Sequence, residues 1–165
     1  MAGQVEANLS EMGIELPDAP SPVADYVPFV KTGNLVFVSG QVAKQPDGTM
    51  ITGQLSADDH ATDGITPPGS QLGLAVGAAT LCALNVLAQL KACIGDLDRV
   101  VRVVKLTGFV NADGTFEQHP QVINGASGLM LGAFGDAGQH ARAAVGCSSL
   151  PGGTICEVEA IFEVE

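Results

Sequence analysis

The chain of 165 residues has no tryptophan, one tyrosine and few basic residues. Its 18 Asp and Glu residues outnumber its 7 Lys and Arg residues, and the formal net charge is −11. Binding to RNA or DNA depends on cations that neutralise phosphates, and the sequence contains no cluster of Lys or Arg. We therefore expect no nucleic-acid partner.

Long apolar runs are also missing. No stretch reaches the roughly 18 uninterrupted apolar residues of a membrane span, because glycines, Gln89 and Lys91 interrupt the apolar segment 69–94. The N-terminus lacks the basic segment and apolar run of a secretory signal. These absences predict a cytoplasmic protein with no membrane partner.

The cysteines and histidines form no metal-binding pattern. They are four cysteines without Cys-x-x-Cys spacing and three scattered histidines: Cys82, Cys93, Cys147, Cys156, His60, His119 and His140. We therefore expect no metal site. Only Cys147 and Cys156 have a spacing that suits a disulfide, across a C-terminal hairpin, and reduced core thiols fit a cytoplasmic protein better.

The residues that are present predict one domain, 1–165, of the α+β class. Hydrophobic residues make up 46% of the chain, enough for a sizeable core. A polar leader, 1–24, contains a short helix, and an irregular acidic loop occupies 55–70. Between and after them, hydrophobic patterns predict strands at 26–31, 34–40 and 100–110, a short edge strand within 44–53, helices at 71–93 and 119–134, and two final strands within 142–164.

This order predicts a sheet with two helices packed on one face. The helices can cover only one side of the sheet, so apolar residues such as Phe37 and Ile161 on the other side need protection. We expect the chain to form an oligomer.

The C-terminal strands are predicted to form a hairpin around Leu150–Gly153. Alternation then puts Arg142 and Glu159 on one face, in diagonal positions roughly 7 Å apart. The other face is apolar, with Ala143, Val145 and Cys147 opposite Ala160, Val158 and Cys156. Arg142 and Glu159 form either a solvated ion pair, worth well under about 1 kcal/mol, or a small-anion site with an acid–base group.

Four ordered blocks of sequence carry a resemblance. Pro22–Val27 contains Tyr26, and Gly33–Gln41 is a strand that ends in Ser-Gly-Gln. Asn85 lies within the long helix, ahead of the strand Val101–Val110. The last block reads Arg142-Ala-Ala-Val, Leu150-Pro151 and Glu157-Val-Glu159-Ala160. Together they resemble the RidA/YjgF family of imine deaminases, also known as the endoribonuclease L-PSP family, over most of residues 20–164.

The resemblance implies a chorismate-mutase-like fold assembled as a homotrimer, with a small carboxylate-bearing metabolite bound in clefts between subunits. It implies cofactor-free hydrolysis of 2-imino or enamine acids, such as 2-aminoacrylate, to 2-oxo acids and ammonia. Arg142 would hold the substrate carboxylate, and Glu159 would position water and relay protons. The other substrate-binding positions implied are Tyr26, Ser39, Gly40 and Asn124.

Two departures from the family pattern leave alternatives open. Ala144 stands where many deaminases carry a cysteine, and residues 55–70 replace a shorter connection. A carboxylate-binding or sensor trimer without turnover is the alternative to the enzyme. Endoribonuclease activity ranks third, because the acidic chain would repel RNA.

Overall fold

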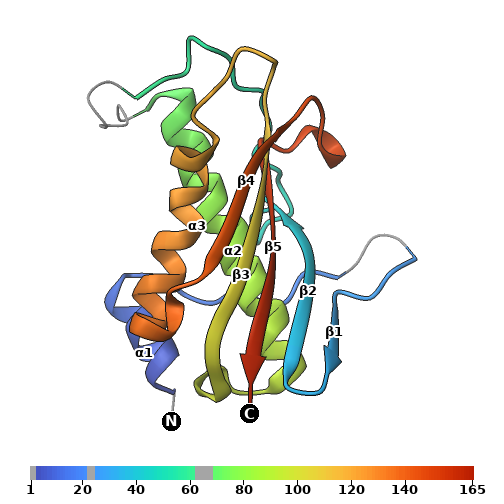
Figure 1. Ribbon diagram of the computed structural model, residues 1–165, viewed down its shortest axis with the longest axis vertical. Coiled ribbons are helices and arrows are strands. Elements are labelled where there is room, and N and C mark those ends of the chain that lie inside the picture. Colours follow the sequence, from blue (N-terminus) through green and yellow to red (C-terminus); the bar gives the residue numbers. More distant parts are fainter. Residues whose placement is uncertain (1–2, 22–24, 62–68) are drawn as a thin grey trace.

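The computed structural model describes residues 3–21, 25–61 and 69–165 (Figure 1). The main elements are α1 (Gln4–Glu11), β1 (Phe29–Thr32), β2 (Leu35–Val42), α2 (Gln71–Ile94), β3 (Val100–Asn111), α3 (His119–Phe134), β4 (Ala141–Cys147) and β5 (Cys156–Val164). The predicted α+β class is confirmed, and both long helices match their predicted ranges closely. Within 44–53 the described chain makes only isolated bridges, such as Lys44 with Met50, in place of the predicted edge strand.

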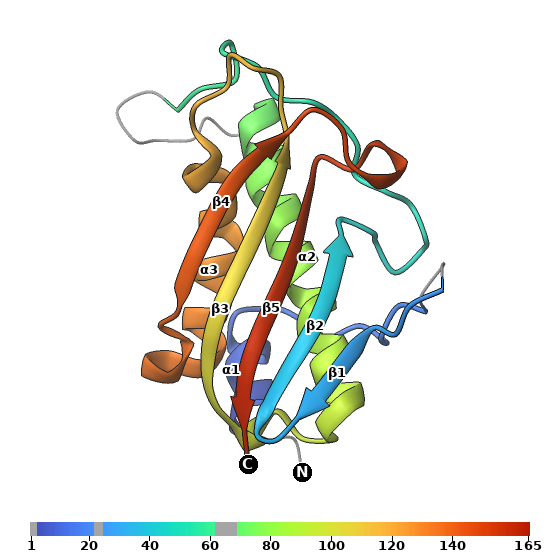
Figure 2. The ribbon, with the colours of Figure 1, turned by 45° about the vertical axis from the view of Figure 1, so that its right-hand side comes forward.

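The five strands form one mixed sheet in the order β1-β2-β5-β3-β4. Helices α2 and α3 cover one face, and the other face is left open, as Figure 2 shows. Strand β5 is antiparallel to both of its neighbours, β2 and β3, and β4 runs parallel to β3. The prediction of two helices on one face is confirmed; α1 adds a third helix, which packs against α3.

The predicted C-terminal hairpin is wrong, because β3 lies between β4 and β5. Leu106 of β3 pairs with Arg142 on one side and with Ala160 on the other. A strand that follows a crossover helix pairs in parallel with the strand before that helix, and β3, α3 and β4 form such a unit. Residues 148–155 then carry the chain past the end of β3 to β5.

The register also corrects the predicted faces of β4. Leu106 and Ala160 are buried beneath the helices, so Arg142, which is in line with them, lies on the helix side of the sheet. Ala144, two residues further along, packs against the same core. Glu159 is paired with Thr107 and belongs to the open face. Arg142 and Glu159 therefore lie on opposite faces, and the predicted diagonal contact does not form.

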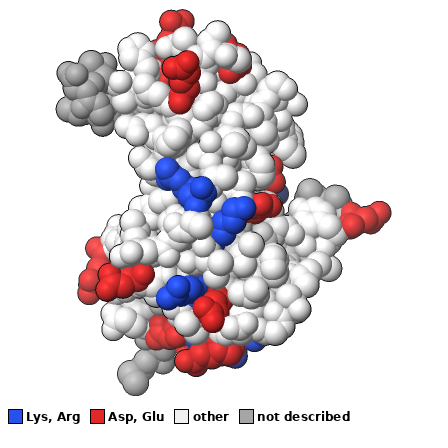
Figure 3. All heavy atoms as spheres, viewed as in Figure 1, with Lys and Arg blue, Asp and Glu red and all other residues white. Residues whose placement is uncertain are grey.

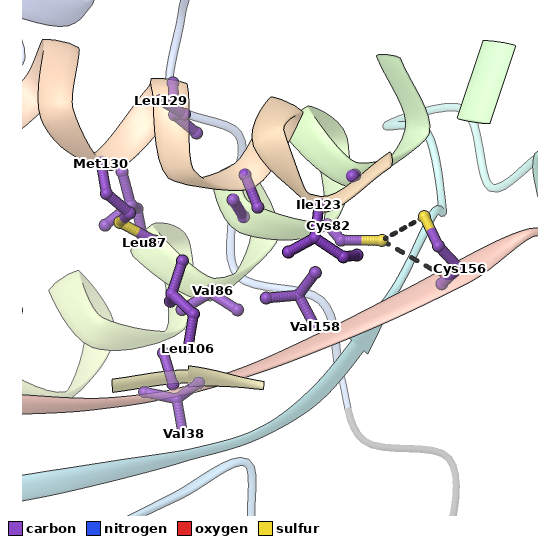
Figure 4. Close-up of a cluster of buried hydrophobic side chains, with 14 of the residues drawn as sticks. Val38, Cys82, Val86, Leu87, Leu106, Ile123, Leu129, Met130, Cys156 and Val158 are labelled. Carbon is purple, nitrogen blue, oxygen red and sulfur yellow. Dashed lines mark hydrogen bonds between the residues drawn. The ribbon is translucent and has the colours of Figure 1, made fainter. Parts of the chain in front are cut away.

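Helix α2 is the core helix of the domain. Ser70 caps its N-terminus by accepting a hydrogen bond from Gly73 N–H, and Gly95, with a φ of 81°, ends it. In length and composition α2 could also cross a membrane, but here it packs against β2, β5 and α3. Figure 4 shows side chains of α2, α3 and the sheet meeting in the core, among them Val86, Leu87, Ile123, Leu129, Met130, Leu106 and Val158.

The cysteine pairing across the sheet differs from the prediction. Cys147 and Cys156 are separated by β3, whose residues Asn111 and Val110 pair with them. Cys156 instead faces Cys82 of α2, with 3.8 Å between the two sulfur atoms. All four cysteines are free. Burial, followed by the neighbouring Cys156, raises the pKa of the Cys82 thiol well above its ordinary value, so this thiol stays protonated.

Helix α1 confirms the predicted short helix of the leader, and a distant residue fixes it in place. Asp98, in the turn before β3, accepts hydrogen bonds from the N–H groups of Gln4 at 2.7 Å and Val5 at 2.8 Å. Glu6 of α1 forms an ion pair with Lys91 of α2. The carboxylate of Asp98 therefore replaces the side-chain cap that α1 lacks at its own N-terminus.

Candidate functional site

A cavity of about 330 Å³ lies beside the end of β2. Tyr26 and Gly40, both predicted site residues, line it together with Asn85 and Glu157. Asn85 is buried in α2 and donates hydrogen bonds to the carbonyl oxygens of Val42 and Lys44. Asn85 therefore attaches the end of β2 to the long helix and fixes this wall of the cavity.

An irregularity in β2 lies beside the cavity, which Gly40 and Gln41 line. The pairing register with β5 shifts between Val38 and Gln41, which turns the Ser-Gly-Gln segment out of regular alternation. The buried Gln41 side chain donates to the carbonyl oxygens of Ser39 and Gly40. Ser39 donates from its hydroxyl to Val27 O at 2.8 Å, and this bond ties the segment that carries Tyr26 to β2.

Glu157 is the ionisable group of the cavity. Burial raises its pKa first, and repulsion from Glu159 on the same strand face raises it further. The carboxylate lies against Gly40, where a Cβ atom would collide with it. The missing side chain at Gly40 thus makes room for a half-buried carboxylate whose pKa is shifted toward neutrality, as acid–base chemistry requires.

Glu159 and Ser39 line a second hollow, of about 270 Å³, on the open face of the sheet. Lys105 and Thr107 of β3 and the half-exposed Phe37 of β2 border the same hollow. Glu159 itself is exposed. The structure therefore separates the two carboxylates that alternate with apolar residues along β5: Glu157 lines the cavity and Glu159 lies in a more open hollow beside it.

Arg142 lies on the edge strand β4, away from both hollows. Its Nη1 donates to Asn124 Oδ1 at 2.9 Å and to Ser127 Oγ at 3.0 Å, both on α3. No carboxylate of the described residues lies within ion-pair distance of it. On the face seen in Figure 3, Lys and Arg side chains lie across the middle, and most Asp and Glu side chains lie toward the ends and margins.

The predicted site residues thus form three groups within one chain: Tyr26 with Gly40, Ser39 with Glu159, and Arg142 with Asn124. Part of the block that carries Tyr26, residues 22–24, lies outside the described residues, as does 62–68 of the predicted 55–70 loop. Sequence reasoning passed over Glu157. Gly40, on the neighbouring strand, lets the Glu157 carboxylate approach the backbone, and this relation is visible only once the strands are paired.

Comparisons with known proteins agree with this architecture. Residues 6–164 match the family model described as "YjgF/chorismate mutase-like, putative endoribonuclease". The chain belongs to the YjgF family. Protein TCP17 of Trypanosoma cruzi is 45% identical over 164 residues, which cover 99% of this chain and 96% of that protein.

Two solved structures place the fold within the same family. One, described as a putative endoribonuclease of Shewanella oneidensis MR-1, is 31% identical with a TM-score of 0.85 and covers 98% of this chain and 100% of that one. The other is RidA from the Antarctic bacterium Psychrobacter sp. PAMC 21119, 25% identical with a TM-score of 0.56, covering 89% of this chain and 94% of that one. The two solved relatives thus carry different descriptions, one as a putative endoribonuclease and the other as RidA.

Proposed function

We propose that this YjgF protein hydrolyses 2-imino acids, and their enamine tautomers such as 2-aminoacrylate, to 2-oxo acids without a cofactor. Water adds to C2 of the iminium acid, a proton moves from the added oxygen to nitrogen, and the C–N bond breaks to release ammonia. The reaction needs a group that holds the carboxylate and a group that accepts and returns a proton. Arg142 and Glu157 supply these two groups.

The observation that carries the proposal is the uncompensated charge of Arg142. Arg142 is exposed on the edge strand β4, where its guanidinium is accessible to a ligand. Here the described partners of the guanidinium are the neutral oxygens of Asn124 and Ser127. A guanidinium that is held in place by neutral groups keeps its charge and its planar fork for an external carboxylate.

Glu157 suits the proton-transfer role better than Glu159, the carboxylate that the family resemblance implied. Glu157 is half-buried, lines the cavity with Tyr26 and Gly40, and has a raised pKa. In this proposal Glu157 accepts a proton from the attacking water and returns it to the departing nitrogen. Glu159, in the adjoining hollow, raises the pKa of Glu157 by repulsion.

The site is completed between copies of the chain. Arg142 contacts α3 from the edge strand, whereas Glu157 lies on the open-face side of β5, so one chain does not bring them together. A second copy that packs its β4 edge against the open face would unite them and cover exposed apolar residues such as Phe37 and Val145. We propose a homotrimer with a shared site at each interface.

A coupled assay tests the activity. An amino-acid oxidase generates the imine, semicarbazide traps what remains, and the protein should lower semicarbazone formation in proportion to its concentration. Arg142→Lys keeps the charge but loses the fork, so 2-oxobutyrate affinity should fall about ten- to hundredfold. Unchanged semicarbazone formation with and without the wild-type protein would contradict the proposed activity.

Ala144 favours a second candidate, a trimer that binds a small carboxylate without turnover. It packs against the core two residues from Arg142 and offers no reactive group. Stabilisation by 2-oxobutyrate in a thermal-shift assay, with no imine hydrolysed, would establish this function instead. Endoribonuclease activity has less support, because a net charge of −11 opposes contact with RNA.

A further inference from the structure

A chain of hydrogen bonds lies behind the Arg142 guanidinium. Ser127 Oγ, which accepts from Arg142 Nη1 at 3.0 Å, is also 3.0 Å from His140 Nε2. His140 Nδ1 is 2.6 Å from the carbonyl oxygen of Gly138, in the 3-10 turn that connects α3 with β4. Ser127 and His140 are half-buried, and neither lines the cavity that contains Glu157.

The direction of each hydrogen bond follows from the last one. A carbonyl oxygen only accepts, so His140 Nδ1 carries a proton, and in the tautomer whose single ring proton is on Nδ1 the Nε2 atom is an acceptor. The Ser127 hydroxyl then donates to Nε2, and its oxygen lone pairs face the guanidinium. Arg142 can only donate, so Ser127 accepts from it in any case, and the role of His140 is to give the Ser127 hydroxyl proton an acceptor that lies away from the guanidinium.

This arrangement uses one end of the guanidinium, and no described residue forms a hydrogen bond or an ion pair with its other edge. Nη1 has two N–H groups and two acceptors, Asn124 Oδ1 and Ser127 Oγ. The Nε–H and the adjacent Nη2–H lie side by side along the other edge, spaced to match the two oxygens of a carboxylate.

We infer that Ser127 and His140 are positioning residues that lock Nη1 of Arg142, so that the carboxylate of the ligand binds side-on through Nε and Nη2. The inference rests on the proposed function, in which Arg142 anchors a carboxylate. Arg142 binds the carboxylate equally well in the bound substrate and in the transition state. Loss of Ser127 or His140, which support Arg142, therefore raises KM and leaves kcat nearly unchanged.

The experiment compares Ser127→Ala, Ser127→Thr and His140→Ala with the wild type. Titration with 2-oxobutyrate should give a dissociation constant about tenfold higher for Ser127→Ala and severalfold higher for His140→Ala. Ser127→Thr keeps the hydroxyl and should bind nearly as well as the wild type. Ser149→Ala, at an exposed serine in the turn after β4, is the matched control and should change nothing.

A second readout does not depend on ligand or activity. Nitrogen-15 NMR of the free protein reports the rotation of the Arg142 guanidinium, which should be slow in the wild type and in Ser127→Thr and faster in Ser127→Ala. If the wild type fails to bind 2-oxobutyrate, the proposed function fails, and the rotation rates still test the positioning. If the wild type binds, Arg142→Lys does not, and Ser127→Ala matches the wild type in affinity and rotation, the inference is overturned.

Discussion

Replacement of Glu157 by glutamine tests the acid–base group while the shape of the cavity is kept. The amide fills the same space beside Gly40 but cannot accept a proton from water. Removal of a general acid–base group lowers kcat by about 10²- to 10⁴-fold. Because Arg142 is untouched, affinity for 2-oxobutyrate should stay close to that of the wild type. The coupled imine assay and calorimetry measure the two quantities separately.

The same substitution should stabilise the protein at neutral pH. Burial and Glu159 both raise the pKa of Glu157 above its ordinary value of 4.5, so the folded state binds the proton more tightly than the unfolded state. The resulting stability is fully present below the ordinary pKa and is lost as the pH rises through the raised value. Glu157→Gln should therefore melt at a higher temperature than the wild type at pH 7–8, and the difference should shrink toward zero in acid.

Two further carboxylates on the same strand face provide the comparison. Glu159→Gln removes the repulsion, so the acidic limb of the rate profile should move to lower pH while most of the activity remains. Glu163 lies outside both hollows, and Glu163→Gln should leave the rate unchanged. Full activity of Glu157→Gln, or a lower melting temperature at pH 8, would refute the reasoning.

Other substitutions test the residues that support the site. Gly40→Ala places a methyl group against the Glu157 carboxylate and displaces it, so kcat/KM measured in the coupled assay should fall about tenfold or more. The control is Gly77→Ala, at a helix position with open space around it, which should keep full activity. Asp98→Ala removes the acceptor for Gln4 and Val5, so urea unfolding should show a loss of about 1–2 kcal/mol; an unchanged midpoint would show that α1 needs no such anchor.

The sequence predicts the helices and strands well where a local pattern determines them. Ser70 and Gly95 bracket α2 with a capping serine and a glycine of positive φ, and both signals are readable without a structure. The β-branched run of β3 is equally plain. The order of the strands in the sheet could not be predicted in this way. The turn residues at Pro151–Gly153 predict a hairpin of β4 and β5 only if no third strand lies between them, and β3 does lie there.

The contrast between local patterns and strand pairing also explains why the sequence did not predict the positions of Arg142 and Glu157 in the site. The helix between β3 and β4 predicts their parallel pairing, which puts Arg142 beside α3 and not beside Glu159. Asn124 was named from the resemblance as a substrate-binding position, and in the structure its side chain accepts a hydrogen bond from Arg142. The role of Glu157 depends on burial against Gly40, on another strand, which no local pattern in the sequence encodes.

The central claim is that Arg142 of one copy and Glu157 of another form one catalytic site. At an imine concentration far below KM, Arg142→Ala and Glu157→Gln should each be nearly inactive alone, the first through a raised KM and the second through a lowered kcat. After the two proteins are unfolded together and reassembled at equal amounts, interfaces that combine an intact arginine with an intact glutamate should restore about a quarter of the wild-type rate of imine hydrolysis, as random mixing in a ring requires. A mixture as inactive as its two components would contradict the claim.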